Sequence, residues 1–336
     1  MRISKRAAGT VAGLSFLAGV AFAPSTSDAE SGAPELAWPI ACEPGRTCEI
    51  QHYVDRDPGP GTRDYHCGLQ TYDGHKGVDI RVPDMAAERR GVEVLAAAPG
   101  KVIGTRDGMA DISIRTPGGP SVTGRECGNG VVIDHGGGWQ TQYCHMAQGS
   151  IAVANGQEVA AGTPLGHVGL SGDTEFPHLH FQVRHDGQII DPFAPDMEAQ
   201  GCKPRAELWR ADARAKATYH AGVVLNAGFA DGPVDMAKIE RGDVAAPSRD
   251  AAAIVAYVRA IALLPGDSVE LELKGPDGAV LARGRRPPLE RWRAQDLIYL
   301  GKKRPATGWP AGAYVAEYRV WRAGKVAISR RLSLNY

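Results

Sequence analysis

Short β-branched and aromatic stretches, separated by glycines, dominate the chain between about residues 37 and 202. Apolar or alternating runs of about four to eight residues that are bounded by turn residues are typical of strands. We expect strands at 92–97, 101–105, 130–135, 139–145, 158–159 and 179–184. Helical periodicity is scarce in this region, and only 83–90 is expected to form a short helix. The pattern predicts a mainly β fold, with an antiparallel sheet or sandwich and long loops.

A second β-rich region follows, at 203–336. We expect a helix at 206–216, and strands at 254–262, 268–274, 279–285, 296–301, 313–322 and 325–332. Gly-containing turns at 275–278 and 322–324 are typical of hairpins. We therefore expect two domains, a larger one at 37–202 and a smaller β-sandwich at 203–336. The second region contains no ligand motif, so its expected role is to brace the first or to bind a partner.

The N-terminus has the pattern of a signal peptide. Basic residues within the first six positions precede an uncharged stretch at 7–23, which ends in small residues. We expect cleavage after residue 23, with Ala29 as a later site, and export to a Gram-negative periplasm or to the medium. The alternative is an uncleaved anchor, but the stretch is short and weakly hydrophobic for a membrane span. The first cysteine is Cys42, which disfavours an N-terminal lipid anchor.

Charge and composition exclude some functions. Lys plus Arg and Asp plus Glu both number 38, so the chain has no net charge to attract nucleic acid or an anionic membrane. We expect no nucleic-acid partner and no integral membrane span in the mature form. The 336 residues are 43% hydrophobic, which is enough to bury a core.

Export makes the six cysteines candidates for disulfides, because oxidising compartments favour them. Cys42 and Cys48 are close enough in sequence to close a short loop. Cys127 and Cys144 lie on two strands that are expected to be neighbours, and Cys67 with Cys202 remains by elimination. Reduced, buried thiols are the alternative. The spacing lacks the paired Cys-x-x-Cys pattern of a structural zinc site.

Two separated segments carry candidate metal ligands. His75 and Asp79 are four positions apart, and Gly74 and Gly77 allow the backbone between them to bend. An imidazole and a carboxylate are both suitable zinc ligands. A His-x-x-x-Asp pair occurs often by chance, and so does the His-x-His pair at residues 178–180. Each pair alone is therefore weak evidence for a metal site.

The later pair is His178-Leu179-His180, in a run that is expected to be a strand. Residues two apart on a strand project from the same face, so one histidine can bind a metal while the other faces a substrate. His145, at the end of the strand expected at 139–145, is a third candidate for the same site. Three protein ligands with one open position are typical of catalytic zinc, whereas four ligands indicate a structural site.

These motifs, in this order, resemble the LytM and lysostaphin-type zinc endopeptidases, a family that includes the beta-lytic metallopeptidases. The resemblance extends over about residues 70–195. Further segments that resemble the family lie at 91–102, 128–136, 166–172 and 191–193.

The resemblance implies that His75, Asp79 and His180 bind zinc, and that His145 and His178 flank the open position as catalytic residues. It also implies zinc as the cofactor and the peptide part of peptidoglycan as the substrate, cut in its stems or cross-bridges. A Gly-Gly bond and a D-amino acid linkage are both compatible with the sequence. The remaining histidines have no motif position and are expected to be surface or structural residues: His52, His66, His135, His167, His185 and His220.

Other functions stay open at this point. A non-catalytic regulator of cell-wall hydrolases would have the same fold, but such relatives generally lose zinc ligands, and all five positions are present here. A carbohydrate-binding or peptide-binding module is another alternative. A secreted protease that acts on proteins would use the same zinc site.

Overall fold

The computed structural model describes residues 32–119, 121–196, 201, 202, 204 and 206–336. The signal peptide expected at 1–23, with its later cleavage site at Ala29, lies outside the described residues. Among the described helices, none has the length and hydrophobicity that a membrane crossing requires.

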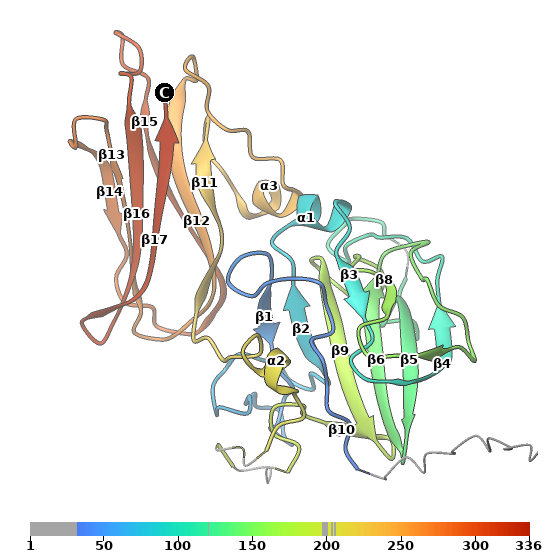
Figure 1. The fold of residues 1–336 in the computed structure, drawn as a ribbon. Coiled ribbons are helices and arrows are strands. Elements are labelled where there is room, and N and C mark those ends of the chain that lie inside the picture. Colours follow the sequence, from blue (N-terminus) through green and yellow to red (C-terminus); the bar gives the residue numbers. More distant parts are fainter. Residues whose placement is uncertain (1–31, 120, 197–200, 203, 205) are drawn as a thin grey trace, which may run out of the picture. The chain divides into compact units, whose positions relative to one another are not determined.

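An antiparallel sheet of eight strands forms the centre of the first region, in the order β1-β2-β9-β6-β5-β4-β7, with β10 paired to β9 (Figure 1). The strands are β1 (Glu49–His52), β2 (Val78–Arg81), β4 (Gly100–Arg106), β5 (Asn129–Gly136), β6 (Trp139–Met146), β7 (Glu158–Val159), β9 (His178–His185) and β10 (Gln188–Ile190). A two-stranded sheet joins β3 (Glu93–Leu95) to β8 (Pro164–His167), and α1 (Met85–Arg89) is the only helix before β3 in the described residues.

Strand β9 explains how the sheet presents its polar side chains. Leu179, Phe181 and Val183 alternate along it and are fully buried in the main hydrophobic cluster. Because side chains alternate between the two faces of a strand, the intervening His178 and His180 project from the opposite face. The packing of Leu179, Phe181 and Val183 in the core therefore determines the face on which the two histidines lie.

Three disulfides cross-link the first region. They join Cys42 to Cys48, Cys67 to Cys202 and Cys127 to Cys144, which confirms the expected pairing, and none of the six cysteines is free. Cys127–Cys144 ties the loop before β5 to the end of β6, beside the candidate site.

The second region has two antiparallel sheets, ordered β11-β12-β15 and β14-β13-β16-β17. Its elements are α2 (Ala211–Arg214), β11 (Val223–Ala230), α3 (Met236–Arg241), β12 (Ala253–Leu263), β13 (Ser268–Lys274), β14 (Val280–Arg285), β15 (Arg293–Lys303), β16 (Ala313–Arg322) and β17 (Lys325–Asn335). Side chains from both sheets, such as Ile254 and Leu271, form one hydrophobic cluster. This is the packing of a β-sandwich, and the predicted mainly β fold is confirmed.

Some elements differ from the sequence expectation. The helix expected at 206–216 is reduced to α2, and β1, β2, β8, β10, β11 and α3 were not predicted. α3 is short, but its ends have clear capping contacts: the Asp235 side chain accepts from the Lys238 amide, and Gly242 ends the helix with a φ of 73°. Such a short helix has too few turns to show a helical period in the sequence.

A buried cluster of charges connects β2 to the second region. Arg81 on β2 and Arg259 on β12 are both fully buried, and both pair with the carboxylate of Glu240 on α3. Arg81 also donates to Gln51 Oε1 at 2.7 Å and lies over the Phe176 ring, 4.1 Å from its centroid. One carboxylate therefore compensates two buried guanidinium groups.

Candidate metal centre

Three candidate ligands from two distant segments converge on one point. Asp79 on β2 lies opposite His180 on β9 in the antiparallel register, and His75 lies in the loop before β2. His180 Nδ1 is 2.9 Å from Asp79 Oδ1, His75 Nε2 is 3.1 Å from the same oxygen, and the two nitrogens are 3.2 Å apart. These three atoms, one from each residue, form a small, nearly equilateral triangle.

This donor set fits zinc. Two imidazole nitrogens and one carboxylate oxygen are ligands that zinc prefers, at about 2.0 to 2.2 Å. In a tetrahedral arrangement, such bonds place neighbouring donor atoms about 3.3 Å apart, close to the 2.9 to 3.2 Å found here. Three donors leave a fourth tetrahedral position for water or a substrate carbonyl, which is typical of a catalytic site.

Glycine at position 77 is required for this convergence. A Cβ atom there would lie 2.6 Å from His180 Nε2 and 2.7 Å from the carbonyl oxygen of Phe181. Any larger residue would push the loop away from β9 and separate His75 from His180. Gly74, with a φ of 73°, provides the turn just before His75.

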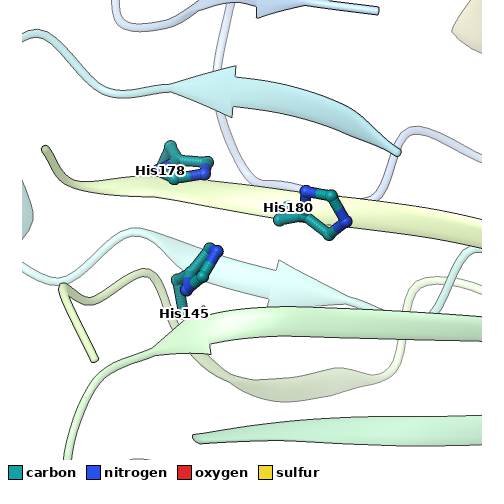
Figure 2. Close-up of side chains that lie close together, drawn as sticks. All are labelled: His145, His178 and His180. Carbon is teal, nitrogen blue, oxygen red and sulfur yellow. The ribbon is translucent and has the colours of Figure 1, made fainter. Parts of the chain in front are cut away.

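His145 and His178 lie close to His180, one member of the triangle (Figure 2). Their ring centroids are 4.7 Å apart, and His178 Nε2 is 3.3 Å from Asp79 Oδ1. His178 Nδ1 is 2.9 Å from the Phe176 carbonyl oxygen, and His145 Nδ1 is 2.8 Å from that of Ser171. A carbonyl only accepts, so both Nδ1 atoms donate, and in the neutral rings Nε2 keeps its lone pair. His145 is therefore oriented to accept a proton at Nε2, whereas His178 Nε2 also contacts the Asp79 carboxylate, which only accepts.

His75 follows the same rule. Its Nδ1 donates to the Tyr53 carbonyl oxygen at 2.7 Å, so its Nε2 lone pair points toward Asp79 and His180. A hydrogen bond on the second ring nitrogen is the usual way in which a protein fixes the orientation of a metal-binding histidine.

The backbone at His145 is unusual. Its φ is 61°, in the left-handed region that few residues other than glycine adopt. Hydrogen bonds hold this conformation from both sides: the His145 amide donates to the Cys127 carbonyl at 2.8 Å, and its carbonyl accepts from Gly169 at 2.9 Å. Strained residues that are held in this way cluster at functional sites, so the conformation supports a role for His145.

Burial and neighbouring charges set the protonation states. Burial lowers the pKa of His145 well below its usual value, and the nearby His178 and His180 lower it further. Burial alone would raise the pKa of Asp79, but the surrounding imidazoles, His75 first, outweigh it and hold that pKa well below its usual range. A neutral His145 and an ionised Asp79 are the states that a proton acceptor and a metal ligand require.

The site opens into a groove of about 330 Å³. Tyr72 forms part of its wall: the side chain is 48% exposed and stacks on His75 with the centroids 4.4 Å apart. Lys76 and Arg184 contribute positive charge to the lining, and Glu126 and Asp173 contribute negative charge.

One histidine that sequence reasoning left without a site role lies in the centre. His52 is buried, and its Nδ1 is 3.0 Å from Asp79 Oδ2. No motif marks His52 in the sequence, because its position depends on the pairing of β1 with β2. The other five lie away from the triangle; His135, for example, contacts the Pro99 carbonyl and Thr141 Oγ1.

The segment that contains the candidate ligands also matches a known family. Residues 73–192 match the model of Peptidase family M23. This part of the chain is an M23 peptidase domain. The match confirms the predicted LytM and lysostaphin-type family, and it covers the segment that holds all five expected site residues.

Similar proteins share this domain. The chain is 32% identical over 150 residues to the DD-carboxypeptidase/endopeptidase Mpg of Neisseria meningitidis serogroup B, which covers 45% of this chain and 28% of that protein. It is 31% identical over 176 residues to the uncharacterized lipoprotein YgeR of Escherichia coli, covering 52% of this chain and 56% of that protein. The chain thus spans less than a third of Mpg.

Among solved structures, the catalytic domain of a mutant of the prophage-encoded M23 protein EnpA from Enterococcus faecalis matches 49% of this chain and 95% of its own, with a TM-score of 0.31 and 23% identity.

Proposed function

We propose that this protein is a zinc-dependent endopeptidase that hydrolyses peptide bonds in peptidoglycan stems or cross-bridges. The observation that carries the proposal is the triangle of His75, Asp79 and His180 donor atoms, with the imidazoles of His145 and His178 beside it. A peptidase family match over the same residues supports it.

His75, Asp79 and His180 would hold the metal. Bound zinc lowers the pKa of a coordinated water and polarises a carbonyl. One of His178 and His145 would accept the proton of the attacking water and return it to the leaving amine, and the other would orient that water. As imidazolium, either ring would also stabilise the negative charge that develops on the carbonyl oxygen. Ser171 and Phe176 would keep both rings in place through their carbonyl groups.

The substrate assignment rests on the relatives. Mpg is named a DD-carboxypeptidase/endopeptidase, and ShyA of Vibrio cholerae, 32% identical over 89 residues, is named a peptidoglycan DD-endopeptidase. Both matches cover less than a third of those proteins. A peptidoglycan substrate also agrees with the N-terminal pattern of an exported protein and with three disulfides, which form in oxidising compartments.

We further propose the division of the chain into a signal peptide at 1–23, the metallopeptidase domain at 37–202 and an accessory β-rich domain at 203–336. Separate hydrophobic clusters support two domains, although Leu208, Trp209, Ala213 and Ala217 pack in the first cluster, so the core of the first domain extends beyond residue 202. The shared ion pairs of Glu240 favour a bracing role for the accessory domain.

Digestion of purified peptidoglycan by the zinc-loaded protein, followed by mass spectrometry of the products, tests the function. We expect new peptide termini with the parent protein and at least about 10²-fold slower formation of them with a His178→Ala variant. Casein in a parallel reaction tests the secreted-protease alternative. Intact peptidoglycan with cleaved casein would replace the substrate assignment, and no cleavage of either, despite bound zinc, would favour the non-catalytic regulator.

A further inference from the structure

His52 contacts Asp79, a proposed metal ligand, at the carboxylate oxygen that does not face His75 and His180. Its Nδ1 is 3.0 Å from Asp79 Oδ2, whereas Asp79 Oδ1 faces His75 and His180. Both side chains are buried, with 9% of His52 and 2% of Asp79 exposed. The two oxygens of this carboxylate therefore have separate partners.

The sheet holds His52 in this position. His52 is the last residue of β1 and pairs with Asp79 after an irregularity in the register that follows Ile50. Its ring packs edge-on against Tyr72, with the centroids 5.3 Å apart, and lies near Phe176. Strand pairing and ring packing thus limit rotation of the imidazole.

We propose that His52 is a positioning residue that orients Asp79 for metal binding. The terminal torsion of an aspartate side chain is broad, so an unrestrained carboxylate would rotate between several orientations. A hydrogen bond donated to Oδ2 keeps Oδ1 directed at the other two ligands. Partners of this kind typically change metal affinity by about 10-fold to 100-fold when removed. The inference rests on the zinc site proposed above, but not on the identity of the substrate.

Two substitutions test the hydrogen bond itself. His52→Phe keeps a ring for packing but removes the donor, and His52→Asn restores a donor near the position of Nδ1. His135→Phe is the matched control, because His135 also donates from Nδ1 to an oxygen, that of Pro99 at 2.7 Å, but lies away from Asp79. Zinc affinity is measured by competition with a chromophoric chelator, and the Tm of each variant is measured without metal.

We expect zinc affinity to fall about 10-fold to 100-fold in His52→Phe, to recover for the most part in His52→Asn and to be unchanged in His135→Phe. The metal-free Tm should change no more in His52→Asn than in the control. Unchanged affinity in His52→Phe, or equal losses in both His52 variants, would overturn the positioning role. A parent protein that binds no zinc would instead contradict the metal site.

A separate observation concerns the face of β9 that carries His180. Gln182 and Arg184 follow His180 at steps of two on β9, so all three project from the same face. Across the sheet, Gln142 on β6 pairs with Gln182. Gln142, Gln182 and Arg184 all line the groove.

Neutral groups hold the guanidinium of Arg184. It donates to Gln142 Oε1, and Gln182 Oε1 accepts from Arg184 Nη2 at 2.7 Å once its amide is turned to match donor with acceptor. In the described part of the chain, no carboxylate lies within 4.0 Å of this guanidinium, and none within that distance of Lys76. Amide partners fix the direction of the group without cancelling its charge.

We infer that Arg184 binds a free carboxylate of the substrate peptide, with Lys76 adding positive charge. A guanidinium presents several donors in a planar array that matches a carboxylate, and a charged partner strengthens such bonds. The inference deepens the proposed function: the preferred substrate is a peptide with a side-chain or terminal carboxylate near the cleaved bond.

A pair of peptidoglycan-derived peptides that differ only in carboxylate or carboxamide tests this subsite. We expect the parent to cleave the carboxylate form with a kcat/KM roughly tenfold higher than the carboxamide form, and this ratio to fall to about one in Arg184→Gln. Arg115→Gln, an exposed arginine outside this groove, should behave as the parent.

Equal cleavage of both peptides by the parent, or an unchanged preference in Arg184→Gln, would overturn the subsite while leaving the proposed function intact. No cleavage of either peptide, or of whole peptidoglycan, would contradict the function as well.

Discussion

Asp79 Oδ1 lies 2.9 Å from His180 Nδ1, although the two residues are 101 positions apart in the chain. The contact exists because β2 and β9 pair in a register that places Asp79 opposite His180. A slip of one residue would turn His180 to the opposite face. The buried apolar residues of β9, such as Leu179 and Phe181, oppose such a slip. The packing of the core thus maintains the geometry of the metal site.

The two histidines of β9 should separate binding from catalysis. His180→Ala removes a donor of the triangle, so we expect loss of zinc and of hydrolysis. His178→Ala leaves the three donors in place, so zinc should remain while turnover falls by about 10²-fold to 10⁴-fold. Zinc content by mass spectrometry and initial rates check both. His185→Ala, further along the same strand, is the control and should keep both zinc and activity. Loss of zinc in His178→Ala, or retained hydrolysis in His180→Ala, would contradict these roles.

Removal of Glu240 should destabilise the protein strongly. Glu240→Ala leaves the buried guanidinium groups of Arg81 and Arg259 without their shared carboxylate. Breaking a buried pair in this way costs about 3–5 kcal/mol of unfolding free energy. Urea unfolding measures the loss, and Glu240→Gln, which keeps the acceptor oxygen, should lose less. Asp243→Ala, an exposed acid near the end of α3, should change stability by about 0.5 kcal/mol or less. A Glu240→Ala effect as small as that of the control would show that the cluster contributes little.

Asp191 should make stability depend on pH. Burial raises the pKa of Asp191 from 3.8 to about 6. Below about pH 4, the folded and the unfolded chain both hold the proton, and the folded state carries no charge penalty. As the pH rises through the folded pKa of about 6, the buried carboxylate ionises, and that stability is lost.

Asp191→Asn stays neutral at every pH, so it isolates this contribution. We expect the unfolding free energy of Asp191→Asn minus that of the parent to increase by up to about 3 kcal/mol between pH 4 and pH 7. Urea unfolding of both proteins across that range measures the difference. A difference that does not change with pH would contradict the assignment.

The long disulfide should stabilise the protein more than the short one. Cys67 and Cys202 are 135 positions apart, whereas Cys42 and Cys48 are 6 apart. Loop-closure entropy predicts a loss of about 5 kcal/mol when the first is replaced by serines and about 2 kcal/mol for the second. Urea unfolding of the two double variants gives the comparison, and equal losses would show that loop length is not the dominant factor.

Local patterns predicted the parts of the site that depend on one segment. The alternation in 178–184 placed His178 and His180 on one face, and the structure agrees. The pairing of cysteines on neighbouring strands could also be anticipated. Asp79 and His75 could be joined to these histidines only through the resemblance to a family, since nothing in the local sequence specifies which strands pair.

Contacts between distant segments could not be predicted. β1 has no alternating pattern, because all four of its residues are buried, so the pairing that brings His52 to Asp79 has no sequence signal. The ion pair of Arg81 with Glu240 joins residues 159 positions apart. A charged residue looks the same in a sequence whether it is exposed to solvent or buried beside a partner.

Metal analysis of the purified full chain shows whether His75, Asp79 and His180 hold zinc. After zinc loading and exhaustive dialysis, we expect about one zinc ion per chain in the parent and a marked loss in both His75→Ala and His180→Ala. A parent protein that retains no zinc, or variants that retain as much as the parent, would contradict this metal site.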